Sequence, residues 1–344
     1  MAIATRHWDR RGTGGLTFTE LGLGTAPLGN LYRAVSDADA LAAMEAAWAE
    51  GVRHFDTAPL YGLGLAETRL NRFLRGRPRD ALVLSTKIGR HLRVCAPDRR
   101  DGIGKWIEVP SRTGVFDYSH DGVMRSLEVS LERLGTDRVD ILYAHDLDVF
   151  THGSEAARDA CLAAFMAGAH RALVRLRDEG VIAAFGLGVN EAAACQWVAE
   201  RGDPDLFLLA GRYTLLEQGP LDGLLPLCAA RGIGVVIGGP FNSGILATGA
   251  RPGAHYNYDP APPAVMERVA RIEAVCAAHG VALAAAALRF PLLHPAVVSV
   301  IPGGQTAAEI RAGARALAAP VPAALWADLK AEGLLSADAP TAAP

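Results

Sequence analysis

The sequence predicts an α/β protein folded as a single (β/α)8 TIM barrel, on three observations. Short apolar runs alternate with helical stretches eight times along the 344 residues. These runs are almost continuously apolar, as expected for parallel strands that are covered on both faces. Most of the helical stretches end near a glycine, which is typical of helix C-caps. A barrel of this kind can occupy this length as one domain.

Each strand is expected to be followed directly or after a loop by its helix. The expected strands are 19–29, 54–57, 81–87, 138–146, 182–190, 205–213, 233–240 and 296–304. The expected helices are 37–51, 65–74, 121–135, 169–180, 191–202, 219–232, 263–280 and 306–317. No second set of strands remains to form another sheet, so one closed barrel accounts for the pattern.

The remaining segments are assigned around this barrel. Residues 6–20 contain turn glycines between short extended pieces and predict a hairpin that closes the N-terminal end. Two long irregular loops, 91–118 and 241–263, follow strands and therefore emerge on the C-terminal face, where such loops are usually functional. We expect one barrel domain over residues 1–335 and a disordered Ala/Pro-rich tail over 336–344.

Composition excludes several classes of function. The net charge is -3 and charges of both signs are dispersed, so nucleic acid and anionic membranes are poor partners. The N-terminus has no apolar signal region, and no charge-free apolar stretch is long enough to span a membrane. The five cysteines show no metal-like spacing and fit a reducing compartment. We expect a cytoplasmic protein with no metal site.

Polar residues mark the ends of three consecutive strands. Asp56 ends the second strand, Lys87 the third and His145 the fourth, with Tyr61 in the loop after Asp56. In a barrel these ends are neighbours on the face that carries active sites. Taken singly, each of these residues fits a structural role better, as a loop cap, a packed ring or a solvated strand end. Together they predict a catalytic group.

The chemistry of this group is proton transfer at a substrate oxygen. A tyrosine with a pKa near 10 is a poor acid or base at neutral pH, and a nearby ammonium is expected to lower that pKa. Asp56 would keep Lys87 charged, and His145 would orient the substrate oxygen. Combined with hydride transfer, the group predicts an oxidoreductase acting on an alcohol, a hemiacetal or a carbonyl.

The motifs HFDTAPLYG, STKIG, YAHD, GLGVN and IPGG occur in this order, and with them the chain resembles the aldo-keto reductases from about Thr17 to Leu317. The resemblance implies that Tyr61 is the acid/base, that Asp56 and Lys87 tune it, and that His145 contacts the substrate oxygen. It also implies nicotinamide cofactor contacts at a larger set of positions. These are Gly24, Thr25, Asn190, Tyr213, Phe241, Asn242, Ser243, Gly244, Gly303, Gly304, Gln305 and Glu309.

Longer matches resemble the branch that contains D-threo-aldose 1-dehydrogenases and pyridoxal 4-dehydrogenase. The resemblance implies oxidation of a sugar hemiacetal, of the L-fucose, L-galactose or D-arabinose type, to its lactone. The alternatives are a pyridoxal 4-dehydrogenase, a general carbonyl reductase, and a non-catalytic subunit that binds nicotinamide. The partner implied in each catalytic case is a small-molecule substrate, a sugar or another cyclic hemiacetal or aldehyde.

The chain departs from the commonest family pattern at several cofactor positions. Ala210 and Gly238 replace a glutamine and a stacking tyrosine, and Tyr213 is the candidate substitute for the aromatic contact. Gly303 and Glu309 stand where a lysine and an arginine hold the 2′-phosphate of NADP. A carboxylate repels phosphate and accepts hydrogen bonds from ribose hydroxyls, so NAD is expected in preference to NADP.

Four aromatic residues of the long loops are candidates for the mouth of the site. They are Trp106, Phe116, Tyr256 and Tyr258.

Overall fold

The computed structural model describes residues 3–342. Its central element is an eight-stranded parallel sheet, whose strands follow one another around the sheet in chain order. The strands are β3 (Leu23–Gly24), β4 (His54–Asp56), β5 (Val83–Ile88), β8 (Ile141–His145), β9 (Ala184–Val189), β10 (Leu206–Ala210), β11 (Gly234–Gly238) and β14 (Val297–Ile301). Parallel bridges from Leu21 to Val300 and from Gly24 to Gly303 join the two edges, so the predicted barrel is confirmed.

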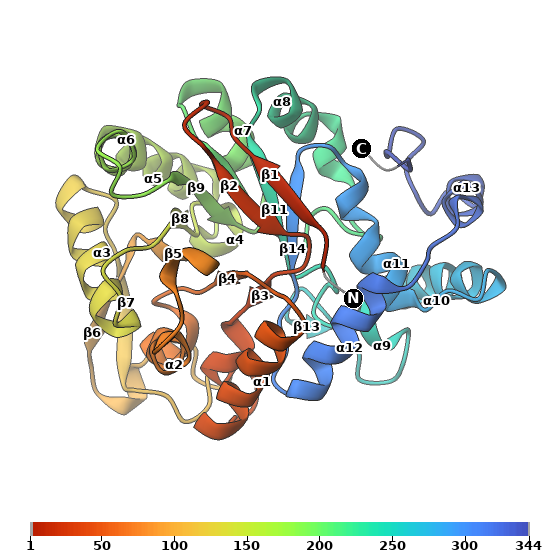
Figure 1. Ribbon diagram of the computed structural model, residues 1–344, viewed down its shortest axis with the longest axis horizontal. Coiled ribbons are helices and arrows are strands. Elements are labelled where there is room, and N and C mark those ends of the chain that lie inside the picture. The colour runs from red at the N-terminus through yellow and green to blue at the C-terminus, as the bar shows by residue number, and fades with distance from the viewer. Residues whose placement is uncertain (1–2, 343–344) are drawn as a thin grey trace.

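Helices surround the barrel, as Figure 1 shows. Those packed around it are α1 (Asp37–Ala49), α2 (Leu65–Leu74), α3 (His120–Leu134), α6 (Ala169–Asp178), α7 (Ala192–Arg201), α8 (Leu224–Arg231), α10 (Pro263–Ala278), α11 (Leu283–Arg289) and α12 (Ala307–Ala318). Successive side chains of each strand point alternately to the surrounding helices and to the barrel interior. Phe55 of β4, for example, packs outward against Phe73 of α2, whereas Asp56 beside it faces the barrel interior.

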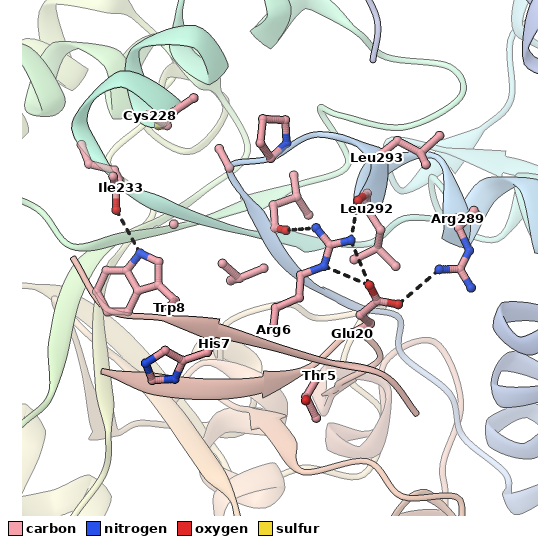
Figure 2. A pocket seen from close by; sticks show the side chains of 17 residues that line it. Thr5, Arg6, His7, Trp8, Glu20, Cys228, Ile233, Arg289, Leu292 and Leu293 are labelled. Atoms are coloured by element: carbon pink, nitrogen blue, oxygen red, sulfur yellow. Dashed lines mark hydrogen bonds and ion pairs between the residues drawn. The ribbon is translucent and has the colours of Figure 1, made fainter. Parts of the chain in front are cut away.

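The N-terminal hairpin consists of β1 (Thr5–Trp8) and β2 (Leu16–Thr19), which lie across one end of the barrel (Figure 1). Phe18 is fully buried and packs in one apolar cluster with inward-facing residues of the strands. Arg6 ties the hairpin to the barrel, because its guanidinium binds Glu20 at 2.9 Å and the carbonyl oxygens of Val297 and Leu292 (Figure 2). The expected closure of the N-terminal end is therefore observed.

A cleft of about 590 Å³ lies beside this hairpin (Figure 2). Its ionic groups bind one another: Glu20 accepts from Arg6 at 2.9 Å and from Arg289 at 3.2 Å. Trp8 donates its indole N–H to the carbonyl oxygen of Gly232 at 2.9 Å. These groups already have hydrogen-bond partners, and they lie at the end of the barrel opposite the polar strand ends. Their contacts therefore anchor the hairpin to the barrel.

The two long loops contain more structure than their sequences indicate. The first forms a hairpin of β6 (Arg90–Val94) and β7 (Arg112–Phe116), so its description as irregular is corrected. The second contains α9 (Ile245–Thr248) and the two short strands β12 (His255–Tyr256) and β13 (Asp259–Pro260). β6 pairs with β7 across a long intervening segment, from Arg90 with Phe116 to Val94 with Arg112, and such pairing leaves no local periodic signal.

Three further helices complete the fold: α4 (Val149–His152), α5 (Glu155–Ala167) and α13 (Ala323–Ala331). After α13, Ser336 donates its N–H to Gln218 at 2.8 Å and Ala339 is buried, so part of the segment expected to be disordered packs on the barrel. Residues 343 and 344 of that segment lie outside the described residues. Between residues 3 and 342 no single helix is both long and apolar enough to cross a membrane. Within this range only α10 and the segment Leu283–Leu293 taken together reach that length and hydropathy, and a bend of 99° separates them.

Candidate active site

Three adjacent strands bring the predicted polar residues together. β4, β5 and β8 are neighbours in the sheet, and their C-terminal ends carry Asp56, Lys87 and His145. All three side chains are buried. Parallel strands present their C-terminal ends at the same rim, so residues far apart in the sequence meet there.

Asp56 and Lys87 form a buried ion pair. Lys87 Nζ lies 2.6 Å from Asp56 Oδ2 and also donates to the carbonyl oxygen of Thr57 at 2.8 Å, while Ser85 Oγ donates to Asp56 Oδ1 at 2.7 Å. Burial raises the pKa of Asp56 and lowers the pKa of Lys87, whereas the contact between the two groups opposes both shifts. These extra hydrogen bonds compensate the loss of hydration that a buried pair suffers.

The position of Tyr61 depends on a tight backbone turn. The residues after it, Gly62, Leu63 and Gly64, have φ values of 63°, 52° and 97°, which lie in the left-handed region. Gly62 is also packed directly on the backbone of Gly29, where a Cβ placed on Gly29 would lie only 2.6 Å from the Gly62 nitrogen. Side chains are excluded at this crossing, so the two glycines fix the path of the loop that carries Tyr61.

Tyr61 lies against two other members of the group, Lys87 and His145. Lys87 Nζ is 4.7 Å from the centroid of its ring, and the His145 ring meets it edge-on with centroids 5.9 Å apart. Burial raises the pKa of Tyr61 well above 10, and the charge of Asp56 adds to this shift. The expected lowering of this pKa by lysine is therefore corrected: the loss of water around the phenol raises the pKa, so Tyr61 is protonated at neutral pH.

His145 is held by its backbone and is neutral. Tyr118 donates its hydroxyl to the His145 carbonyl oxygen at 2.6 Å, which fixes the strand end. Burial lowers the pKa of His145 well below 6.5, and the positive charges of Lys87 and Arg90 act in the same direction. A neutral imidazole has one N–H donor and one acceptor nitrogen, so His145 can direct a single donor at a substrate oxygen.

A cavity of about 350 Å³ opens at this rim and includes Asp56 and Tyr61 in its lining. Ten of the positions predicted to contact the cofactor also line it: Gly24, Asn190, Phe241, Asn242, Ser243, Gly244, Gly303, Gly304, Gln305 and Glu309. The cavity thus connects the polar group with the loops that follow β11 and β14.

Two predicted cofactor contacts lie elsewhere. Thr25 is fully buried, and its hydroxyl donates to the Asp56 carbonyl oxygen at 2.9 Å, so it fixes the backbone of Asp56. Tyr213 is also fully buried and packs on Phe290 and His294, with ring centroids 5.1 and 5.8 Å away. The prediction of a Tyr213 contact is wrong because the chain turns at Gly211 and carries this ring into the helical layer.

Glycines form much of the wall of this cavity. Gly211, Gly239 and Gly244 have positive φ values and expose backbone rather than side chains to it. At Gly24 an added Cβ would lie 3.2 Å from the Ile301 carbonyl oxygen, so a side chain there would be tightly packed against this wall. The side chain of Asn242 is engaged by Thr214 and by the Gly211 carbonyl oxygen, which leaves its backbone to face a ligand.

Aromatic residues of the loops enclose the site. Tyr258 lines the cavity with Tyr32, and the Tyr32 ring stacks on His255 at 6.4 Å. Trp106 is buried, with its ring 6.4 Å from that of Tyr61.

The other two aromatic candidates lie away from the cavity. Tyr256 binds Glu217, and Phe116 packs under Arg90. Tyr32 and Asn257 also line the cavity, although no strand end marks them in the sequence, and so does Arg212 at the end of the expected strand 205–213. Among residues 3–342, no group of three or more histidines, cysteines or carboxylates is arranged to hold a metal ion.

Comparison with known proteins agrees with this geometry. The model of the Aldo/keto reductase family matches residues 20–332. The chain is 43% identical to a pyridoxal 4-dehydrogenase of Microbacterium luteolum, over 94% of this chain and 97% of that protein. It is 42% identical to a D-threo-aldose 1-dehydrogenase of a Pseudomonas species, over 92% and 94%.

Solved structures share the fold at lower identity. The holo form of an aldo-keto reductase from Bacillus halodurans superimposes with a TM-score of 0.72 at 23% identity, covering 99% of this chain and 98% of that one. A glycerol dehydrogenase from Gluconobacter oxydans gives 0.74 at 19% identity, covering 99% and 97%. The chain therefore belongs to the aldo/keto reductase family and is an oxidoreductase.

Proposed function

We propose that the protein is an NAD-dependent aldose 1-dehydrogenase, which oxidises the cyclic hemiacetal of a sugar to its lactone. The observation that carries this proposal is the Asp56–Lys87 ion pair packed against Tyr61 at the end of a glycine-lined cavity. The similarity to a D-threo-aldose 1-dehydrogenase along most of the chain supports the substrate class.

In this mechanism Tyr61 removes the proton from the anomeric hydroxyl, and His145 binds the same oxygen. A nicotinamide held in the cavity would supply the acceptor for the hydride of the anomeric carbon. Tyr61 must first release its own proton to solvent to act as a base, and Lys87 Nζ at 4.7 Å from the centroid of its ring stabilises the resulting phenolate. Because burial raises the pKa of Tyr61 well above 10, we expect oxidation to accelerate as the pH rises above neutral.

Asn190 and the loop 241–244 would hold the cofactor in the cavity, with Gln305 and Glu309 at its adenosine end. Gly303 supports NAD over NADP, because a Cβ there would lie 2.5 Å from Pro27 Cγ and a lysine would not fit without movement. The five free cysteines are consistent with a cytoplasmic location.

Oxidation of pyridoxal is the second candidate function, supported by the similarity to a pyridoxal 4-dehydrogenase. It uses the same half-reaction on a different hemiacetal. Steady-state turnover of L-fucose, L-galactose, D-arabinose and pyridoxal with NAD and NADP separates the candidates. Reduction of neither cofactor by any of the four would overturn both.

The role of Tyr61 has its own test. Tyr61→Phe removes the proton-transferring oxygen and retains the ring, so we expect turnover to be lost while NADH binds with unchanged affinity. Persistent turnover in this variant would show that Tyr61 is not the acid/base.

A further inference from the structure

A second carboxylate lies beside His145 and has no part in the proton transfer described above. Asp146 follows β8 directly, and its Oδ1 is 3.5 Å from His145 Nε2. This distance exceeds that of a normal hydrogen bond, so neither group satisfies the other although they are neighbours at the same strand end. The side chain is almost completely buried, with 8% exposed.

The backbone at Asp146 is costly for a residue with a side chain. Its φ is 60°, in the left-handed region, while its N–H donates to the Gly188 carbonyl oxygen at 3.1 Å. Aspartate tolerates this conformation better than most residues, but glycine adopts it without strain. A strained backbone and a buried carboxylate at the rim of the barrel indicate a functional role.

Arg90 fixes one side of the carboxylate. Its Nε lies 2.8 Å from Asp146 Oδ2, and its guanidinium stacks on the ring of Phe116 at 4.6 Å. Arg90 and Phe116 belong to the hairpin β6–β7, which begins two residues after β5 ends. This arrangement neutralises Oδ2 and leaves Oδ1 on the side of His145.

The charge of Asp146 acts on the hydroxyl groups around the cavity. Burial raises the pKa of Tyr61, and the charges of Asp56 and Asp146 are among the groups that raise it further. Burial likewise raises the pKa of Tyr258, with Asp146 as the next cause. Both tyrosines line the cavity, so Asp146 lies within electrostatic reach of the reacting region.

We propose that Asp146 is a specificity-determining residue, which accepts a hydrogen bond from a hydroxyl on the carbon next to the reacting carbon. His145 Nε2 then contacts the reacting oxygen, while Asp146 Oδ1 accepts a hydrogen bond from the hydroxyl on the adjacent carbon. The inference rests on the proposed function and deepens it, because it restricts the substrate to 2-hydroxy hemiacetals, which are aldoses. Pyridoxal has no aliphatic hydroxyl next to its reacting carbon.

The chemistry of the pair supports this assignment. An ionised carboxylate only accepts hydrogen bonds, and a neutral histidine offers one donor, so together they match two adjacent substrate oxygens. A site built to bind a hydroxyl rejects the analogue without it strongly, because a buried polar group is then left unpaired. An aldose and its 2-deoxy counterpart differ in this one hydroxyl.

The test compares D-arabinose with 2-deoxy-D-ribose, which is also the 2-deoxy form of D-arabinose, and L-galactose with 2-deoxy-L-galactose. For the wild-type protein we expect kcat/KM to fall by about 100-fold or more when the hydroxyl is removed. Asp146→Asn keeps the size of the side chain and tolerates the left-handed backbone. Because it replaces a charged acceptor by a neutral amide oxygen, it should lower kcat/KM for the full aldoses by about 10-fold and for the deoxy sugars by less than about 3-fold.

The melting temperature of the variant should fall, because Arg90 loses its ionic partner, whereas its NADH dissociation constant is expected to match wild type and reports on the cofactor cavity. Equal losses on aldose and deoxy sugar would overturn the inference and make Asp146 a positioning residue for His145. Equal turnover of an aldose and its 2-deoxy counterpart by the wild-type protein would also overturn the role of Asp146. Turnover of pyridoxal but of no aldose would do the same. In both cases the oxidation of hemiacetals would still stand. Turnover of none of these substrates would remove the proposed function itself.

Discussion

Lys87 Nζ lies 2.6 Å from Asp56 Oδ2 inside the barrel, and both side chains are almost completely buried. The pair joins two neighbouring strands and faces Tyr61 with its positive end. Structure and chemistry therefore depend on the same contact, which makes its removal informative about both.

Lys87→Met is expected to lower the free energy of unfolding by about 3–5 kcal/mol, because it leaves the Asp56 carboxylate buried without its partner. Urea denaturation at pH 7 measures this loss. Adding Asp56→Asn to Lys87→Met should recover part of the stability but no turnover. Strictly additive losses in the double variant would show that the two groups do not interact.

Gly62→Ala should displace Tyr61 and lower kcat by at least about 10-fold. The added methyl group collides with the Gly29 carbonyl oxygen, and the left-handed φ of 63° adds strain. Gly76→Ala is the matched control, since Gly76 has a φ of 78° but no atom within 4 Å of its added Cβ. Steady-state kinetics of the two variants separates displacement from strain, and equal kcat values would contradict the role of the glycine crossing.

Buried histidines should make the fold sensitive to acid. Burial lowers the pKa of His54 to about 3, and the charge of Lys87 adds to this shift. The folded state therefore keeps His54 neutral while the unfolded chain binds a proton below its pKa of about 6.5. Stability from this group is complete above pH 6.5 and is lost as the pH falls toward 3, by about 1.4 kcal/mol per pH unit.

The measurement is the free energy of unfolding at pH 7 and at pH 5, for wild type and His54→Asn. The variant should lose less stability over this interval, because groups other than His54 contribute equally to both proteins. An identical pH dependence in the two proteins would show that His54 is not the group that titrates.

Glu309→Arg should raise the ratio of kcat/KM with NADP to that with NAD by at least about 10-fold, since it replaces a repulsive charge by an attractive one. Glu309 lines the cavity, and Arg33 lies 3.4 Å from its carboxylate. Glu309→Gln is the control that removes the charge alone and should give a smaller rise. An unchanged ratio in both variants would contradict the assignment of Glu309 to cofactor selection.

The sequence by itself determined the barrel and the place of its polar rim. Eight apolar runs with helices between them admit one closed parallel sheet, and topology then brings the ends of neighbouring strands together at one rim. Asp56, Lys87 and His145 could be found for this reason, because each interrupts an apolar run at its C-terminal end. The cofactor positions came from motifs, and most of them line the cavity.

Only the tertiary structure decided how the loops and the charges behave. Arg90 reaches Asp146 through the pairing of β6 with β7, and Tyr213 turns into the helical layer at Gly211. The direction of the Tyr61 pKa shift depends on how much water the surrounding chain removes. Such properties arise from contacts between distant residues, and the local pattern of the sequence does not encode which side chain will lie against which.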